Sequence, residues 1–391
     1  MTGRTHRLPA DAAQVVAFAA ITATALLAAP AIAAQLASQF HLPPSAIGFY
    51  FTVEQGGMCL AALPALWWLG RVPWRQVAGL AMAAFILANL ASAQVSHFAW
   101  LVPLRAISAL SGGTLMVLSM TLAGRSPERE RLFALWTLGQ LTVGVALLYA
   151  LPRLFQLFGL QVLYLLIAAL MVASTPLLKP LPAHVQAPAR PQPGSRTSLW
   201  GAAPGLASVL LYYIGYGGIW PFLSAIARAG GSQPLASGEV LALAGLCGIA
   251  GALAAALRAR QGGWGVLAPG FGAHLLALFL LLQAPALLRF AVGACLLKGA
   301  SNFTLPFLLG KTARLGSDRR LMGMANMAIG GGLAIGPLIT GRLIELSGGY
   351  TLPISLSAGL ILASALLLLP IGQASPTRPR PADPAADPAQ A

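Results

Sequence analysis

The chain has 391 residues, of which 57% are hydrophobic and 8% are charged, and its formal net charge is +15. Soluble domains carry about 25% charged residues, so this composition excludes a single soluble domain, and the 9 acidic residues are too few to solvate so large a surface. Each membrane-crossing helix takes about 20 apolar residues, so twelve spans would leave room only for short loops, a linker and short tails.

Apolar segments follow one another along the whole chain. They run over 12–36, 45–70, 76–96, 98–122, 132–152, 159–178, 203–228, 236–257, 264–284, 286–310, 321–344 and 351–372. Helices are the only form we expect, because open strands leave unpaired backbone groups in lipid. The sequence therefore predicts an all-α membrane protein with twelve transmembrane helices in two pseudo-symmetric six-helix bundles.

The first segment has some features of a signal peptide. Arg4 and Arg7 precede the apolar run, and Ala31-Ile-Ala33 is similar to a cleavage site. We expect the segment to be retained, because its apolar run is longer than a signal core and its removal would break the twofold organisation of the chain.

A Pro-rich polar stretch separates six apolar segments from the next six. The expected organisation is a bundle at 1–178, a cytoplasmic linker at 179–200, a second bundle at 201–372 and a disordered cytoplasmic tail at 373–391. An internal repeat supports this division: a shift of 189 residues places Arg131 on Arg320 and Arg153 on Arg342 without a gap.

The positive charges lie on one side of the predicted spans. With a cytoplasmic N-terminus, the cytoplasmic Lys and Arg are Arg4, Arg7, Arg71, Arg75, Arg125, Arg129, Arg131, Lys179, Arg190, Arg196, Arg258, Arg260, Lys311, Arg314, Arg319, Arg320, Arg378 and Arg380. Only Arg153, Arg228 and Arg342 fall in loops on the other side. This asymmetry predicts a multi-pass inner-membrane protein with both termini in the cytoplasm. It also attributes the net charge to topology and contact with anionic membrane lipids, with no nucleic acid as a partner.

At this point the chain resembles the major facilitator superfamily. An arginine followed by a glycine-rich stretch, as in the family's fourth helix, is present from Arg105 to Gly113, and the stretch from Gly330 to Pro337 is similar to its eleventh helix. The resemblance implies alternating access, in which two halves rock around a central site lined mainly by the first, fourth, seventh and tenth helices.

Two departures from the family pattern concern gating and export. In the loop after the second helix, Gly70 stands where the family usually has an aspartate, and only Arg71 and Arg75 keep their character. The Gly-Pro motif that drug:proton antiporters often carry late in the fifth helix is absent, although Gly139 and Gly144 are present there. The resemblance therefore supports the fold more strongly than it supports an antiporter.

Charges inside the spans are the candidate functional residues, because a charge at the bilayer centre costs about 2.5–3.5 kcal/mol. Glu54 is interpreted as a proton carrier. Arg105, with Ser108 on the same helix face, is interpreted as the counter-ion that releases the proton, or as a residue that binds an anionic substrate. The alternative for both is a structural ion pair or a set of hydrogen bonds between helices.

A second group of candidates lies in the seventh and tenth segments. Lys298 and Asn302 form a polar stripe that could bind an anion or another polar substrate. Tyr212, Tyr216 and Trp220 recur every four residues and could stack on a flat, apolar or cationic substrate. The alternative is that the lysine pairs with a neighbouring helix and that the aromatic stripe is packing.

The remaining charged and polar residues in the spans are assigned structural roles. Glu239 follows a helix start, where an acid is favoured, and Arg289 lies near the end of a span. His274 is alone on an apolar face and is expected to be packed and hydrogen-bonded. Cys59, Cys247 and Cys295 are expected to be reduced and buried, and no residues have the spacing of a catalytic or metal site.

These features predict a transporter rather than an enzyme, with no cofactor and no metal. The expected activity is proton-coupled secondary transport of a small organic molecule by a monomer, with export of hydrophobic or cationic compounds slightly favoured. Proton-driven uptake of an organic anion is the alternative, suggested by Arg105 and Lys298. A membrane-embedded enzyme is the remote alternative.

Overall fold

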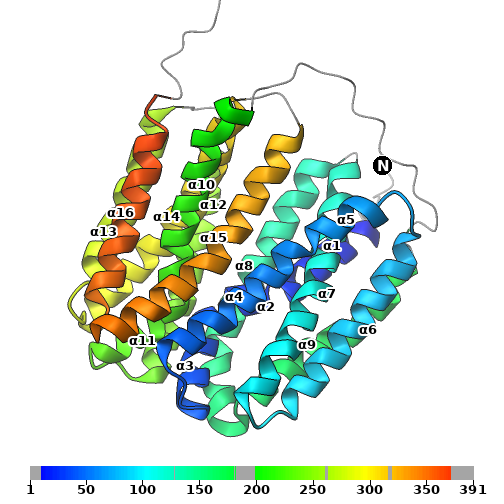
Figure 1. Ribbon diagram of the computed structural model, residues 1–391, viewed down its shortest axis with the longest axis horizontal. Helices are drawn as coiled ribbons and strands as arrows, with labels where there is room; N and C mark the ends of the chain where they lie inside the picture. The colour runs from blue at the N-terminus through cyan, green and yellow to red at the C-terminus, as the bar shows by residue number, and fades with distance from the viewer. Residues whose placement is uncertain are drawn as a thin grey trace, which may run out of the picture.

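The computed structural model describes residues 10–126, 128–179, 181, 199–259, 263–315 and 319–370. Regular structure within these ranges is entirely helical. Most of the expected linker, the expected tail at 373–391, and Arg4 and Arg7 lie outside the described residues. Figure 1 shows two groups of helices side by side, α1–α9 in one and α10–α16 in the other.

The first group corresponds to the six spans expected in the N-terminal half. Its elements are α1 (Ala10–Thr22), α2 (Thr24–Leu27), α3 (Ala29–Gln39), α4 (Pro44–Leu60), α5 (Ala62–Trp68), α6 (Trp74–Ala93), α7 (Phe98–Arg125), α8 (Arg129–Phe158), α9 (Gln161–Ala173) and the short 3-10 helix η1 (Thr175–Leu178). The first expected span is built from α1, α2 and α3, and the second from α4 and α5.

The second group corresponds to the C-terminal half. Its elements are α10 (Leu199–Ile219), the 3-10 helix η2 (Trp220–Phe222), α11 (Leu223–Ala229), α12 (Pro234–Leu257), α13 (Trp264–Leu281), α14 (Leu287–Ala313), α15 (Arg319–Ser347) and α16 (Thr351–Leu367). Here α10, η2 and α11 together form the seventh expected span.

Eight helices within the described residues are long and apolar enough to cross a membrane by length and composition. The other four expected spans are the first, second, sixth and twelfth, which are interrupted or shorter. The first is interrupted near Thr22 and Thr24, whose hydroxyls bond to the carbonyls of Phe18 and Ala20 one turn earlier. Such back-bonding bends helices.

The same helix pairs pack together in both halves. In the first half α1 packs on α8, α4 on α7, α6 on α7 and α6 on α9. The corresponding pairs in the second half are α10 with α15, α12 with α14, α13 with α14 and α13 with α16. The internal repeat seen in the sequence thus corresponds to a repeated packing pattern.

The two halves contact each other mainly toward one end of the molecule. We call this the distal end; it carries the α3–α4, α8–α9 and α11–α12 connections, and the opposite, basic end carries Arg71, Arg125, Arg258 and Arg314. Across the halves α4 packs on α15, α8 on α12, and α3 on η2 and α11, and Figure 1 shows α3 and α11 close together at the bottom. At the basic end, α5 packs chiefly on α4 and α7 of its own half. The conformation is therefore closed at the distal end.

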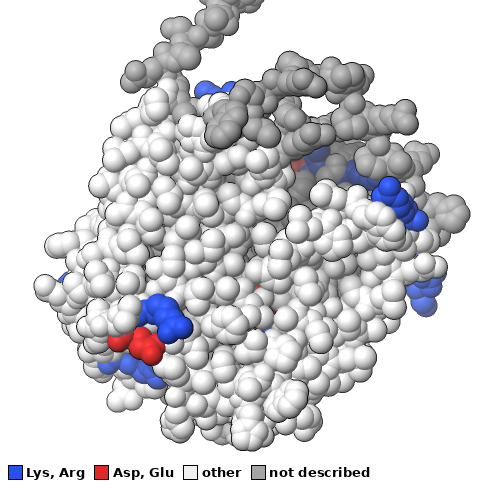
Figure 2. All heavy atoms as spheres, viewed as in Figure 1, with Lys and Arg blue, Asp and Glu red and all other residues white. Residues whose placement is uncertain are grey.

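The outer surface of the bundle is apolar. Figure 2 shows a face almost free of charge between the two ends, with Lys, Arg, Asp and Glu near its margins. Large apolar side chains are strongly exposed on the outside of the bundle, for example those of Leu66, Leu257 and Leu288. Lipid is the solvent that such a surface requires.

Glycines let α15 pack closely on its neighbours in both halves. A Cβ atom at Gly336 would lie 2.5 Å from the Ile214 oxygen and 2.6 Å from the Gly218 nitrogen of α10. A Cβ at Gly341 would lie 2.3 Å from the Pro44 oxygen of α4. The eleventh span thus joins its own half to the other half through backbone contact.

We expect Gly336→Ala to destabilise the protein, because overpacking against backbone costs about 1–3 kcal/mol or more. The matched control is Gly323→Ala on the same helix, where a Cβ would meet nothing within 4 Å. Thermal unfolding of the purified protein in detergent measures both variants. Equal stability of the two variants would contradict the close packing of α15 on α10.

Candidate transport site

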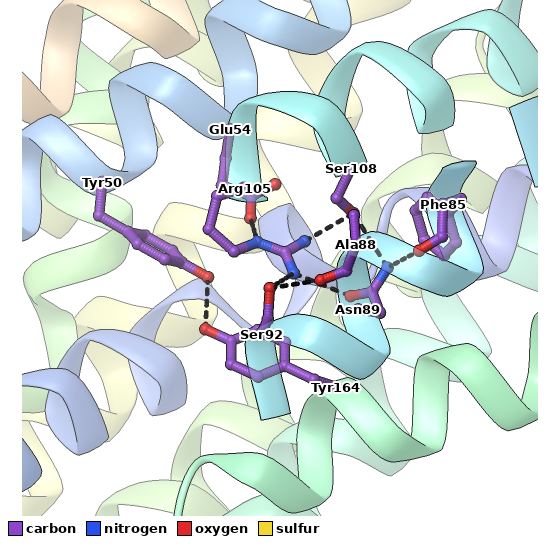
Figure 3. Close-up of polar contacts among 9 residues, drawn as sticks. All are labelled: Tyr50, Glu54, Phe85, Ala88, Asn89, Ser92, Arg105, Ser108 and Tyr164. Carbon is purple, nitrogen blue, oxygen red and sulfur yellow. Dashed lines mark hydrogen bonds and ion pairs between the residues drawn. The ribbon is translucent and has the colours of Figure 1, made fainter. Parts of the chain in front are cut away.

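A buried ion pair lies inside the first half. Arg105 on α7 donates through Nε to the Glu54 carboxylate on α4, and each residue is 2% exposed. Figure 3 shows the guanidinium in the middle of a group of polar side chains from several helices. The two residues singled out in the sequence as a proton carrier and its counter-ion are therefore brought into direct contact.

Further side chains complete the guanidinium's hydrogen bonds. Its other nitrogens donate to Asn89 Oδ1 at 2.8 Å, to Ser92 Oγ at 3.5 Å and to Ser108 Oγ at 2.8 Å. The Tyr164 ring lies 4.8 Å from the guanidinium carbon and so adds a cation–π contact. Four helices, α4, α6, α7 and α9, thus meet at one arginine, as a buried charge requires.

Ser108 was expected beside Arg105 from the sequence, whereas Asn89, Ser92 and Tyr164 were not. Asn89 is fully buried, and a lone amide in an apolar span is a signal that could have identified it. Tyr164 also shares a hydroxyl contact of 3.2 Å with Tyr50. Only the folded packing brings these residues to Arg105.

A small pocket lies beside the ion pair within the first half. Glu54, Arg105, Thr22, Thr24 and Phe85 are among the residues that line it. It has room for about one water molecule. Water can therefore lie next to the carboxylate, although the structure leaves no room there for a larger molecule.

The second half holds a lysine against an aromatic surface. Lys298 on α14 is 8% exposed, its Nζ donates to Tyr216 Oη at 3.1 Å, and it lies 4.0 Å from the centre of the Trp220 ring. Tyr216 and Trp220 are stacked on each other. Among the described residues the lysine has no carboxylate partner. The aromatic face of Trp220 is thus already occupied by the protein's own cation.

Asn302 lies next to Lys298 and has a free donor. Its Nδ2 is buried and has no hydrogen-bond partner among the described residues. A Cβ at Gly248 of α12 would lie 2.6 Å from this nitrogen and 3.0 Å from Cγ of Lys298. Both polar side chains therefore occupy the space that this glycine leaves.

Tyr212 and His274 form a third polar contact in the second half. The tyrosine hydroxyl lies 3.0 Å from His274 Nδ1, and both residues are fully buried. The other ring nitrogen, Nε2, has no partner among the described residues. The histidine is packed and hydrogen-bonded, as the sequence analysis expected, and Tyr212 faces it rather than Lys298.

One hydrogen bond links the aromatic group to the first half. Trp220 Nε1 donates to the Leu26 carbonyl at 2.9 Å. Pro30 has no N–H to donate to that carbonyl four residues earlier, so the oxygen remains available. The interruption of the first span thus provides the acceptor for a bond between the halves, close to the pocket-lining residues Thr24 and Ala25.

The other charges of the spans have structural partners. Arg289 donates to the carbonyls of Phe279, Leu280 and Leu282. Glu239 pairs with Arg153 of the other half at the distal end. Glu239 thus has a structural partner, as expected, but the partner is Arg153 and not the start of the helix. The first turn of α12 contains no acid, because Glu239 lies beyond it.

The three cysteines are free thiols, as expected, but they are half-buried and not buried. Cys59 lies between the halves, where its Sγ is 3.8 Å from the Met327 carbonyl. Within the described residues no group of three or more His, Cys, Asp or Glu could hold a metal ion.

Replacing Trp220 with Phe removes the bond to Leu26 and keeps most of the ring. We expect the distal contact between the halves to loosen, because a hydrogen bond between the halves is lost at a cost of about 0.5–1.5 kcal/mol. Labelling of a cysteine introduced at Ser237 measures the opening in a variant whose native cysteines are replaced by alanine, because this residue is 2% exposed near the distal start of α12, the helix that packs on α8 of the other half. Trp67→Phe, on the exposed surface, is the control, and equal labelling of both variants would contradict the linking role.

Comparisons with known proteins agree with this fold. A family model described as Major Facilitator Superfamily matches residues 14–311. No curated protein matches the chain.

Several solved transporters share the fold. A D-xylose-proton symporter aligns with a TM-score of 0.71 and 13% identity, covering 93% of this chain and 96% of the symporter. The nucleoside transporter NupG aligns with a TM-score of 0.68 and 13% identity, covering 92% and 98%. A bacterial homolog to the human lysosomal transporter Spinster, inward-facing and occupied, aligns with a TM-score of 0.66 and 13% identity, covering 92% and 94%. At this identity the likeness shows the fold alone.

The expected architecture, an all-α membrane protein with twelve spans in two pseudo-symmetric bundles, is confirmed by the helices and by these folds. The family model covers the first half and most of the second. The chain belongs to the major facilitator superfamily of transporters.

Proposed function

We propose that the protein is a proton-coupled secondary active transporter of a small organic molecule that works by alternating access. The observation that carries this proposal is the buried Glu54–Arg105 pair beside a pocket with room for water. Two charges buried in lipid-facing helices cost several kcal/mol each in desolvation. A purely structural contact between helices could be made more cheaply by apolar side chains.

Proton loading would change the charge of this pair while leaving most of the hydrogen bonds of Arg105 in place. Protonation of Glu54 would remove its charge attraction to Arg105. The guanidinium would keep its bonds to Asn89, Ser92 and Ser108, which are neutral acceptors. Glu54 can therefore gain and lose a proton while Arg105 stays hydrogen-bonded, which is what a reversible coupling residue needs.

Alternating access is supported by where the halves meet. The closed distal end and the few contacts of α5 at the basic end describe one of two access states. We propose an inner-membrane protein with both termini in the cytoplasm, because the lysines and arginines of the loops gather at the basic end. In that orientation the conformation is inward-facing. One chain supplies both halves of the central region, which supports a monomer.

The geometry around Lys298 supports an organic anion as the substrate. A cationic compound would have to displace the ammonium group from Trp220 and Tyr216. An anionic group would instead provide the counter-charge that Lys298 lacks among the described residues, and an acceptor for the free Asn302 donor. Export of hydrophobic or cationic compounds, slightly favoured by the sequence, therefore has less support here than proton-driven movement of an anion. A membrane-embedded enzyme has the least support, since the family consists of transporters.

Glu54→Gln should abolish proton-coupled transport, because an amide cannot exchange a proton yet keeps an oxygen for Arg105. We expect a pH gradient no longer to drive accumulation in proteoliposomes, while exchange of labelled substrate across the membrane without a gradient is retained. The substrate for this assay is first selected by thermal stabilisation of the purified protein with a panel of small organic anions and cations. The control is Glu128→Gln, at an exposed ion pair with Arg131. Gradient-driven accumulation by E54Q at the wild-type level would remove Glu54 from the mechanism.

Lys298→Ala should weaken the binding of anions much more than that of cations of similar size. The loss of a charged hydrogen-bond donor is about 1.5–3 kcal/mol, which corresponds to roughly 10-fold to 100-fold in affinity. Titration of organic carboxylates and of amines of matched size into the purified protein measures the difference. Lys298→Arg, which keeps the charge, is the control. An equal loss for both ligand classes would indicate that Lys298 is structural.

A further inference from the structure

An unsatisfied cation lies at the basic end of the second half, away from the transport site. Lys311 is in the last turn of α14, is 8% exposed, and its Nζ is buried without a hydrogen-bond acceptor among the described residues. The ammonium group lies 4.2 Å from the centre of the Trp264 ring. A ring face attracts a cation but does not accept its hydrogen bonds as an oxygen does, so the ammonium group still lacks an anionic acceptor among the described residues.

The neighbouring helix start adds further donors. Trp264 is the first residue of α13, and its Nε1 is also buried and unpartnered among the described residues. Gly263 precedes it with φ of 93°, no side chain caps the helix, and its first turn contains no acid. The first N–H groups of a helix carry a partial positive charge and favour an anion. The Lys311 ammonium group and the first turn of α13 would thus both be stabilised by an anion.

The other described charges nearby are also positive. Arg258 follows α12, and Arg314 follows α14; both are exposed. None of the ion pairs formed by the described residues involves Lys311. Asp318 is the acid closest to it in sequence, and it lies outside the described residues.

We propose that Lys311, Trp264 and the start of α13 form a site for the phosphate group of an anionic membrane lipid. Apolar surface is exposed at the same end of the molecule: Leu257, the last residue of α12, which α13 follows, is 87% exposed. The site also lies at the end of the spans, where headgroups lie, on the side where loop arginines gather. A lipid supplies the phosphate and covers the apolar surface together, whereas a soluble anion supplies only the charge. The proposal depends on the membrane orientation and not on proton coupling.

The test is thermal unfolding of the full-length protein in detergent with added dioleoylphosphatidylglycerol or dioleoylphosphatidylcholine. We expect phosphatidylglycerol to raise the unfolding midpoint of the wild type more than phosphatidylcholine does. Lys311→Met should need about fivefold more phosphatidylglycerol for the same rise, the loss expected for one cation near an anionic surface. Lys311→Arg should retain the response, and Trp264→Phe, which keeps the ring but not the N–H, should lose part of it. Lys179→Met removes an exposed cation at the same end of the other half and should leave the response unchanged.

Four results would overturn the proposal. One is a response to phosphatidylglycerol in K311M that equals the wild-type response. Another is a rise of the wild-type unfolding midpoint with inorganic phosphate alone that equals the rise with phosphatidylglycerol, which would make the ligand a soluble anion. A third is a loss of stability in Asp318→Asn, without lipid, equal to that in K311M, which would make the chain's own carboxylate the counter-ion. If K311M does not fold, W264F decides, and an unchanged response in that variant is the fourth.

Discussion

The Glu54–Arg105 pair is the constraint on which the first half depends. Both charges are almost completely buried, and removing one partner of such a pair costs about 3–5 kcal/mol, because the other charge stays behind. The arginine therefore holds α4, α6, α7 and α9 around it. A half that is organised in this way can move as one unit, which is what rocking of two halves requires.

The second half stabilises its buried cation, Lys298, without an acidic partner among the described residues. Lys298 is stabilised by the Tyr216 hydroxyl and the Trp220 ring, whose own N–H bonds to the first half through Leu26. Pro30 removes the N–H that would donate to this carbonyl in a continuous helix, and the Trp220 indole donates to it where the first span is interrupted. The face of the Trp220 indole therefore contacts Lys298, the candidate substrate-binding residue, and its N–H forms a hydrogen bond between the two halves. A substrate that draws Lys298 away from Trp220 would act directly on the contact that keeps the distal end closed.

The spans could be predicted from sequence, because an apolar run of sufficient length indicates a membrane-crossing helix. Glu54 and Arg105 could be predicted as candidate functional residues, because a charge inside a span is costly whatever its partner is. The partners could not be predicted. Arg105 meets Asn89 and Tyr164 only after three further helices pack around it, and Glu239 meets Arg153 across 86 positions of sequence. Local patterns such as Arg105 with Ser108 on one helix face were predictable, whereas contacts between helices depend on which faces meet.

The charges of the two halves together set the sign of coupling in the proposed cycle. With Glu54 ionised, the Glu54–Arg105 pair has no net charge. Lys298 then gives the central region one positive charge. A proton on Glu54 adds a second positive charge in a medium of low dielectric constant, where charges interact strongly. Proton binding then favours the binding of an anion and opposes that of a cation, and by linkage the reverse also holds. An anionic substrate would therefore travel with the proton and a cationic one against it, so the direction of coupling follows from the substrate's charge.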